Sequence, residues 1–595
     1  LLASRITRRQ TMQAGAAVAA GTGLAACSGG GGKSYNGSGT KGGNDTHPVG
    51  KGIAPTPRNK TVVIDQINMT VFDRFNPFIP NGESYQGGVG QISKEYLWYA
   101  NLATGEIKAW LGKSYSYSSD FTKFTIKLNP AAKWSDGKPF TSADVKFTME
   151  MVKKNPTLLG SGPVVTEAES ISAPDPQTVV IELNTRDPRY HYNFICGIIG
   201  TSFPIVPEHV WSGQDPTSFA NNPPVYTGPY VLDKVNADHQ LFVWKKNANY
   251  WAKSEMDPEP EYVVFRNSPS PDAEFQQFKQ AQADVSANSG MYQLMKSAID
   301  GGYKDSIITE MTDPCPSAFF VNCDPSKGLL ADPRMRGVIS SLVDRDKIGK
   351  SVWPIKVPAA IYPWADYPSN DKFKNPAIAD KYPLTYDPKK AASLLDEIGA
   401  KADGSGKRSY QGKKLSYEII TSVTNADPEY FIAQLLAGDL KKIGINATVK
   451  SLAPSVYSDR VRRGQYDIRS EWICGEVFDP FQVYSLFDGS MYTPAGKTTT
   501  STNTVRLKNA GLDADINKLR DKSPTDPASK PLFADAMNAW FTQLPVIPET
   551  QKKFGHIFNQ TYWTGWPTTD NLYQVPNNWW GQFMFVIGQL KATGK

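Results

Sequence analysis

The chain of 595 residues is 40% hydrophobic and 21% charged, a composition that is ordinary for a water-soluble protein of several domains. Its net charge of +6 falls to +3 without the three arginines that precede Cys27, since 61 basic residues then stand against 58 acidic ones, and this balance argues against a nucleic-acid-binding protein. The five histidines and five cysteines show no metal-ligand spacing, so we expect neither a structural metal nor a cofactor.

The first 27 residues resemble a bacterial twin-arginine export signal that ends in a lipobox. Arg8 and Arg9 lie in a basic region, and the apolar stretch 14–26 is too short to span a bilayer and ends in Leu-Ala-Ala before Cys27. The resemblance implies that Cys27 carries a lipid, which would anchor an exported protein to the outer face of the cytoplasmic membrane, at the cell surface or in the periplasm. The alternative is a disordered basic N-terminus with a chance cysteine.

Residues 28–59 are predicted to form a flexible tether, because Gly, Ser, Asn and Thr dominate and few side chains there are apolar. Folded structure is expected from about Lys60, with a strand at 61–67. Another strand is predicted at 124–128, where apolar and polar residues alternate. A turn at 133–140 and a capping box at 141–144 then predict a helix that runs to about Lys153.

Three later Asp-Pro pairs each predict the start of a helix, because Asp can cap the helix and Pro fits its first turn. The pairs begin at Asp332, Asp387 and Asp427, and the second helix should end at Gly399. The third helix lies between predicted strands at 415–421 and 445–452. This strand–helix–strand spacing predicts a right-handed crossover with parallel strands, and therefore an α/β sheet covered by helices.

Five segments, in order along the chain, resemble the extracellular solute-binding proteins of family 5, the oligopeptide- and dipeptide-type receptors of ABC importers. They are Lys133-Trp134-Ser135-Asp136-Gly137-Lys138-Pro139-Phe140-Thr141, Thr227-Gly228-Pro229-Tyr230, Asn249-Tyr250-Trp251, the stretch from Asp332-Pro333-Arg334-Met335-Arg336 to Asp344-Arg345, and Leu544-Pro545-Val546-Ile547-Pro548. Tyr226 stands where the family usually has Gly. The motif at 133–141 is read as turn and packing residues, so these segments indicate the fold rather than the ligand.

The resemblance implies an α/β, two-lobed periplasmic-binding-protein fold of type II, with an extra domain on the first lobe and a hinge of two crossing strands. We expect the crossings at Phe319–Asn322 and near Val546–Thr550. The expected parts are lobe I at 60–100, 225–320 and 551–595, the extra domain at 101–224, and lobe II at 321–550.

The resemblance also implies the function: a monomeric, non-enzymatic receptor that traps a solute between its lobes and presents it to a membrane permease. Hinge closure would shift the population toward the loaded, closed form. A glycoside hydrolase is the rival from another class, but no pair of carboxylates can be singled out for it, and the Gly-x-Ser-x-Gly motif of serine hydrolases does not occur.

Aromatic residues near the C-terminus favour an oligosaccharide ligand. Trp563, Trp566 and Asn571 lie in the segment 562–573, which combines indole rings with amide and carboxylate groups, as sugar faces and hydroxyls require. This segment is similar to that of the cellobiose-type and manno-oligosaccharide-type members of the family. The alternative is that these aromatic residues belong to the core of the first lobe.

A second candidate wall runs from Glu471 to Pro480. Trp472 could stack on a ligand, whereas Gly475 occupies the ungapped counterpart of the Asp with which peptide-binding relatives pair a peptide amino terminus. Glu476 is next to it and could restore that anchor, so a di- or oligopeptide ligand stays open, as does nickel or another small solute. Asn76 could place an amide at the site or merely form a turn, and Cys315 and Cys323 are near enough in sequence to pair.

Overall fold

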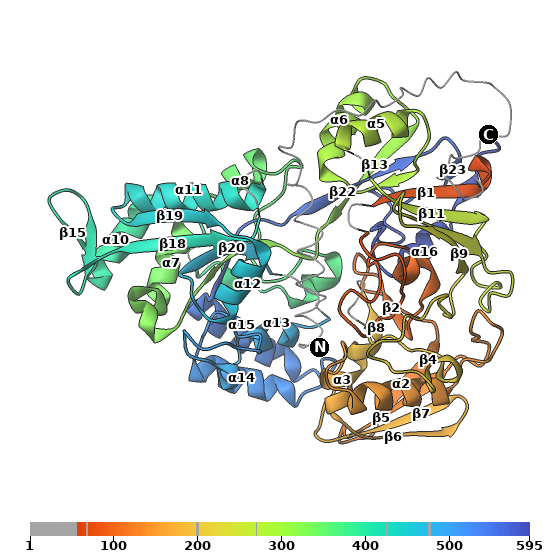
Figure 1. Cartoon of the computed structure of the whole chain (residues 1–595). Coiled ribbons are helices and arrows are strands. Elements are labelled where there is room, and N and C mark those ends of the chain that lie inside the picture. The colour runs from red at the N-terminus through yellow and green to blue at the C-terminus, as the bar shows by residue number, and fades with distance from the viewer. Residues whose placement is uncertain are drawn as a thin grey trace.

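The residues that the structure describes, 56–66, 69–197, 202–268, 270–382, 384–423, 427–473 and 478–595 of this computed structural model, form two lobes side by side (Figure 1). Each lobe has a β-sheet and a hydrophobic core of its own. The expected two-lobed α/β architecture is therefore confirmed. Within these ranges, no helix combines the length and the apolar character needed to cross a membrane.

Lobe I is built on a seven-stranded sheet that gathers strands from three parts of the chain. The predicted strand at 61–67 is β1, which is buried on both faces, as its apolar run suggests, and pairs in parallel with β11 and β12. In order across the sheet the strands are β13 (Ser306–Thr312), β22 (Lys553–Asn559), β12 (Val285–Ser286), β1 (Thr61–Gln66), β11 (Tyr262–Asn267), β10 (Leu241–Lys246) and β9 (Tyr230–Asn236). This lobe also holds α5 (Pro271–Lys279), α6 (Ser289–Asp300), α16 (Phe583–Ile587), β23 (Trp563–Thr564) and β24 (Lys591–Ala592).

The extra domain is an antiparallel sheet with α2 packed against it. Its strand β5 alternates buried and exposed residues as predicted, and the backbone N–H of Thr141 donates to the carboxylate of Asp144 at 2.8 Å, which confirms the capping box of α2. Trp134 is buried and donates to the same carboxylate, so the motif around it has the expected packing role. The elements are β4 (Gly112–Tyr117), β5 (Lys123–Leu128), β7 (Thr178–Leu183), β6 (Ala168–Asp175), α2 (Ser142–Lys154), α3 (Pro163–Thr166) and α4 (Glu208–Trp211).

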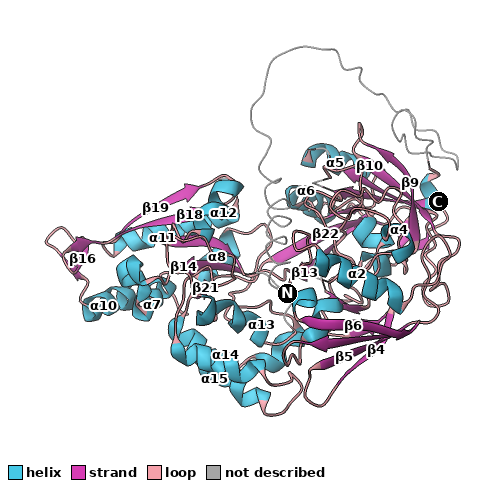
Figure 2. Cartoon of the chain, turned by 60° about the horizontal axis from the view of Figure 1, so that its bottom comes forward, coloured by secondary structure: helices cyan, strands magenta, loops and turns pink. Residues whose placement is uncertain are grey.

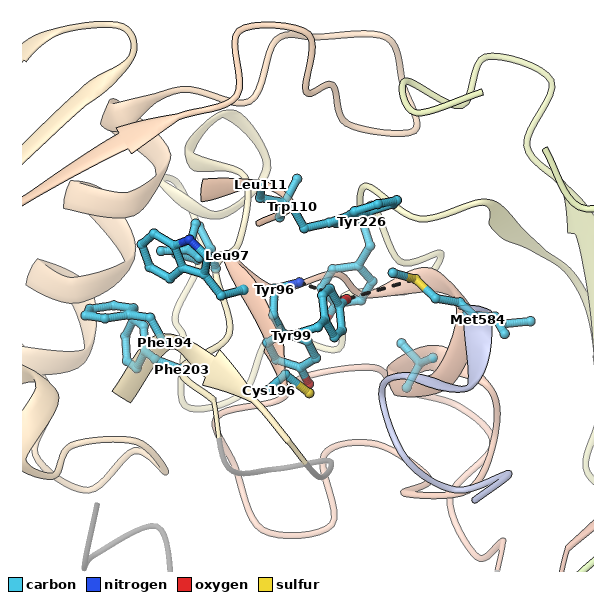
Figure 3. Packing of buried hydrophobic residues seen from close by; sticks show 14 of the residues in the cluster. Tyr96, Leu97, Tyr99, Trp110, Leu111, Phe194, Cys196, Phe203, Tyr226 and Met584 are labelled. Atoms are coloured by element: carbon cyan, nitrogen blue, oxygen red, sulfur yellow. Dashed lines mark hydrogen bonds between the residues drawn. The ribbon is translucent and has the colours of Figure 1, made fainter. Parts of the chain in front are cut away.

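A small sheet ties the extra domain to the rest of lobe I. It consists of β3 (Ile107–Ala109), β2 (Trp98–Ala100) and β8 (Ile195–Cys196). The aromatic side chains around this sheet, Tyr96, Tyr99 and Trp110, pack with Cys196 of β8 and with Met584, which comes from the C-terminal part of the chain (Figure 3). The extra domain therefore shares one continuous core with lobe I.

Lobe II has a five-stranded sheet that contains the predicted strand–helix–strand unit. Strands β18 and β19 are parallel, and α11 joins them and packs on β19 (Figure 2). Across the sheet the order is β19 (Asn446–Ser451), β18 (Ser416–Thr421), β20 (Ile468–Trp472), β14 (Ser317–Val321) and β21 (Val546–Pro548), with a hairpin sheet of β15 (Lys401–Ala402), β16 (Arg408–Tyr410) and β17 (Lys413–Lys414). The helices are α7 (Pro333–Ser341), α8 (Arg345–Ser351), α9 (Pro376–Ala379), α10 (Pro388–Ile398), α11 (Pro428–Lys442), α12 (Pro454–Arg462), α13 (Phe481–Tyr484), α14 (Ala510–Arg520) and α15 (Ser529–Gln543).

Two of the three Asp-Pro helix starts are capped as predicted. The side chains of Asp332 and Asp387 accept from backbone N–H groups at 2.9 Å, and α10 ends at Gly399 with a φ of 92°. Asp427 precedes α11 but its side chain makes no cap bond, so the prediction was wrong there. The Asp-Pro pair marks the helix start in all three cases, whereas the side-chain cap bond forms in two of them.

The first crossing between the lobes lies a few residues earlier in the chain than the sequence predicts. Phe319–Asn322 does not cross between the lobes, since β14 pairs with both β20 and β21 inside the sheet of lobe II. The crossing is the segment 313–316, between the end of β13 and the start of β14, and the return is 549–552, between β21 and β22. The reason is that the apolar run of β14 is buried in the core of lobe II rather than spanning to the other lobe.

Candidate ligand-binding site

Both sheets point the carboxyl ends of their parallel strands toward the hinge. In lobe II, β18 and β20 are parallel, and the end of β20 pairs with the start of β14, with Trp472 opposite Ser317. In lobe I, β13 runs directly into the first crossing, and β1 ends at Gln66, whose amide donates to the backbone oxygen of Asn578 at 3.0 Å. Because ligands of open α/β sheets bind outside the carboxyl ends of the strands, this edge is the candidate site.

Lys552 links the two crossing segments at this edge. Its ammonium lies 3.3 Å from the carboxylate of Asp313 in the other crossing, and 4.6 Å from the ring centroid of Trp472. It also lies 5.9 Å from the ring of Trp353, whose indole N–H donates to Thr550 at 2.8 Å. The site therefore contains two half-buried indole rings that already attract a cation.

Three buried carboxyl groups feel the charge of Lys552, and we call Asp313, Glu429 and Glu549 the hinge acidic cluster; of the three, Asp313 forms the ion pair with Lys552. Burial raises the pKa of each of the three, and the positive charge of Lys552 opposes that rise in every case. The second cation that acts on Glu549 is Arg345. Its guanidinium donates to the backbone oxygens of Pro548, at 2.8 Å, and Leu384, at 2.7 Å. Three carboxyl groups thus face two cations, a balance that favours either a bound proton or a further cation.

Of the residues proposed from the sequence, Trp472 lies at this edge. Glu476 falls outside the described residues. Trp563 and Trp566 are only 1% and 4% exposed, and their indole N–H groups donate to the backbone oxygens of Thr61, at 2.9 Å, and Asn559, at 3.1 Å. These contacts and the stacking of Trp566 on Phe558 place both rings in the core of lobe I, which favours the packing interpretation.

The two proposed asparagines lie elsewhere in lobe I. Asn76 is buried, its amide donates to the backbone oxygens of Pro216 and Phe219, and its oxygen accepts from Phe78. Asn571 is exposed and closes a tight turn with Thr568. Asn76 and Asn571 therefore have the contacts of turn residues, and none of these contacts reaches the hinge.

The cysteine pair considered from the sequence does not form. Cys315 is disulfide-bonded, whereas Cys323 is free and buried. Both flank the extended strand β14, whose five residues alone span roughly 13 Å from first to last Cα at 3.3 Å per residue, beyond the reach of a disulfide. Among the residues that the structure describes, no group of three or more His, Cys, Asp or Glu side chains is arranged to hold a metal ion.

Known proteins of similar fold and sequence bind solutes. The probable peptide-binding protein YejA of Agrobacterium fabrum is 24% identical over 500 residues, which is 75% of this chain and 77% of that protein. A probable ABC transporter-binding protein of Deinococcus radiodurans is 25% identical over 421 residues, covering 65% of this chain and 68% of the relative.

Among solved structures, the periplasmic oligopeptide-binding protein of an oligopeptide ABC transporter from Thermotoga maritima matches with a TM-score of 0.76 and 24% identity, over 90% of this chain and 100% of that one. The mannohexaose-bound form of the Thermotoga protein matches with a TM-score of 0.71 and 24% identity, over 91% and 100%. These likenesses confirm the type II periplasmic-binding-protein fold. The model for bacterial extracellular solute-binding proteins, family 5 (middle), matches residues 106–493. The chain belongs to this family of extracellular solute-binding proteins, which serve ABC transporters as substrate-binding components rather than as enzymes.

Proposed function

We propose that this chain captures a di- or oligopeptide between its two lobes, by the peptide's amino terminus, and delivers it unchanged to an ABC permease. The observation that carries the proposal is the surplus of carboxyl groups in the hinge acidic cluster, next to two indole rings. An ammonium group that enters this edge would gain a charged partner, without which its burial would be costly. Several relatives have peptide-binding names, which points in the same direction.

An oligosaccharide, the ligand favoured by the aromatic content of the sequence, is the second candidate. Its support is the similar Thermotoga protein, which was solved with mannohexaose, and the rings of Trp472 and Trp353, which could stack on pyranose faces. The burial of Trp563 and Trp566 weakens this candidate, because their faces were its main sequence evidence. A sugar would also bring no cation to the hinge acidic cluster, whose raised pKa values would then have to be met by a bound proton.

The membrane anchor and the permease partner are proposed from the sequence alone. We propose that a lipid on Cys27 holds the receptor, as a monomer, at the outer face of the cytoplasmic membrane, within reach of its permease. Glu476, four residues after Trp472 in the sequence, stays a candidate ligand contact.

A thermal-shift and calorimetric screen of the full chain tests the ligand. Its probes are alanine oligomers of two to five residues, the same peptides with an acetylated amino terminus, cello-oligosaccharides and mannohexaose. We expect free peptides to raise the melting temperature by mass action and acetylated ones to fail, because acetylation removes the ammonium. A shift with sugars but not with peptides would replace the peptide by the second candidate.

The same screen on Trp472→Ala locates the site. Loss of a stacking ring should weaken binding by about 1 to 3 kcal/mol, the range found for aromatic residues at the centre of interfaces. Tyr115→Ala is the matched control, because Tyr115 is a 36% exposed aromatic residue on β4 of the extra domain and should leave the affinity unchanged. Equal affinities of Trp472→Ala and the unaltered chain would remove Trp472 from the site.

A further inference from the structure

The extra domain lies beside α14 of lobe II (Figures 1 and 2). A buried ion pair joins these two parts of the molecule. The guanidinium of Arg189, in the extra domain, donates from Nε to Oδ2 of Asp479 at 2.8 Å. The two side chains are 4% and 0% exposed. The hydroxyl of Tyr192 donates to the same oxygen at 3.0 Å, so two groups of the extra domain converge on one carboxylate of lobe II.

The remaining contacts of Arg189 also reach into lobe II. Its Nη1 donates to the backbone oxygen of Leu519 at 3.0 Å, near the C-terminal end of α14, where helix carbonyls carry partial negative charge. Its guanidinium carbon lies 4.4 Å from the ring centroid of Phe481 in α13. The ring of Phe478 packs on Tyr192 with a centroid separation of 4.8 Å.

Arg189 is buried and serves the contact between the two parts of the molecule. The hydrogen bonds of its side chain with Asp479, Leu519 and Arg520 all cross from the extra domain to lobe II, so a separation of the lobes would break them together. The ion pair is dry and hydrogen-bonded, and a dry pair of this kind is strongly orientation-dependent. The two lobes are thus joined covalently at the hinge, and this buried ion pair is a non-covalent contact between them at a distance from the hinge along the chain.

We propose that Arg189 and Asp479 form an interdomain latch, which stabilises the closed arrangement of the lobes and thereby controls how readily the receptor opens to release its solute. A contact made only in the closed form shifts the open–closed equilibrium by its whole differential free energy. The latch acts without touching the solute, so it holds for a peptide and for a sugar alike.

Asp479→Asn tests the latch in the full chain without any ligand. Oδ1 of Asp479 accepts from the backbone N–H of Phe481 at 2.9 Å, and asparagine can keep that bond while it removes the charge that faces Arg189. The closed form of the variant would bury an uncompensated guanidinium, which opening lets water solvate. We expect the ratio of open to closed molecules to rise at least tenfold, measured by small-angle X-ray scattering as a larger radius of gyration.

Two further variants are measured in the same way. Tyr192→Phe should raise the ratio of open to closed molecules less than Asp479→Asn does, and Arg189→Gln should raise it by a comparable factor. Glu418→Gln is the matched control, because Glu418 pairs with Lys450 and Arg460 inside lobe II, and its scattering should equal that of the unaltered chain. If Asp479→Asn does not fold, the other two variants decide. Scattering profiles that stay unchanged in the folded latch variants, as judged by circular dichroism, would overturn the proposal.

Discussion

Glu95 shows how burial controls the charge of a single residue in lobe I. Its carboxylate accepts from Trp110 at 2.7 Å, from Tyr250 at 2.5 Å and from Trp251 at 2.8 Å, and the residue is 3% exposed. These three donors favour the ionised form, but burial outweighs them and raises the pKa of Glu95 to about 7. The native state therefore binds a proton that the unfolded chain releases at lower pH.

The sign of the resulting pH dependence follows from this raised pKa. The protonated carboxyl contributes stability below the unfolded pKa of 4.5, and this contribution is lost as the pH rises through 7. We expect the free energy of unfolding of the unaltered chain to fall, relative to Glu95→Gln, by about 3 kcal/mol over that window, since one pKa unit corresponds to about 1.4 kcal/mol. Chemical denaturation between pH 4.5 and pH 7.5 measures this, with exposed Glu106→Gln as control. Parallel profiles of Glu95→Gln and the unaltered chain would contradict the assignment.

At the scale of elements, the sequence predicts helices and strands well where local chemistry decides them. The Thr141 capping box, the Asp387 cap and Gly399 at the end of α10 were all predicted, because each bond joins residues close in the chain. The uncapped start of α11 was not predicted, because an Asp-Pro pair suits the first turn of a helix whether or not the carboxylate turns toward the backbone N–H groups.

The cap of α10 yields a direct stability prediction. Asp387→Ala removes the acceptor for the backbone N–H of Lys390 and should lower the free energy of unfolding by about 1 kcal/mol, the typical value of a helix N-cap. Lys389→Ala, an exposed change in the same turn, should have little effect. Urea denaturation of both variants provides the measurement, and equal stabilities would show that the cap bond contributes nothing.

At the scale of the whole molecule, the family motifs predicted the two lobes, whereas the site depends on contacts that the sequence could not reveal. Trp472 could be proposed because it is an aromatic residue near a recognisable motif. The sequence did not reveal the charged residues of the site, Lys552, Glu429 and Asp313. They come from three distant parts of the chain and are brought near one another only in the folded protein, where both sheets end at the hinge. Conversely, Trp563 and Trp566 looked like a sugar platform, because a local cluster of rings cannot tell a core from a binding surface.

Among the described residues, the lobes are connected by the hinge, by the ion pair between Arg189 and Asp479, and by further contacts such as the hydrogen bond from Ser369 to the backbone oxygen of Leu102. A solute at the carboxyl edges would therefore be enclosed between these connections and would contact both lobes. This enclosure, rather than any single residue, is what the central claim requires.

Hydrogen–deuterium exchange of the full chain with and without saturating pentaalanine tests that claim most directly. We predict slower exchange both at Ile468–Trp472 in lobe II and at 577–580 in lobe I, with the peptide recovered at unchanged mass. Protection confined to one lobe, or a peptide that is cleaved on incubation, would contradict capture between the lobes.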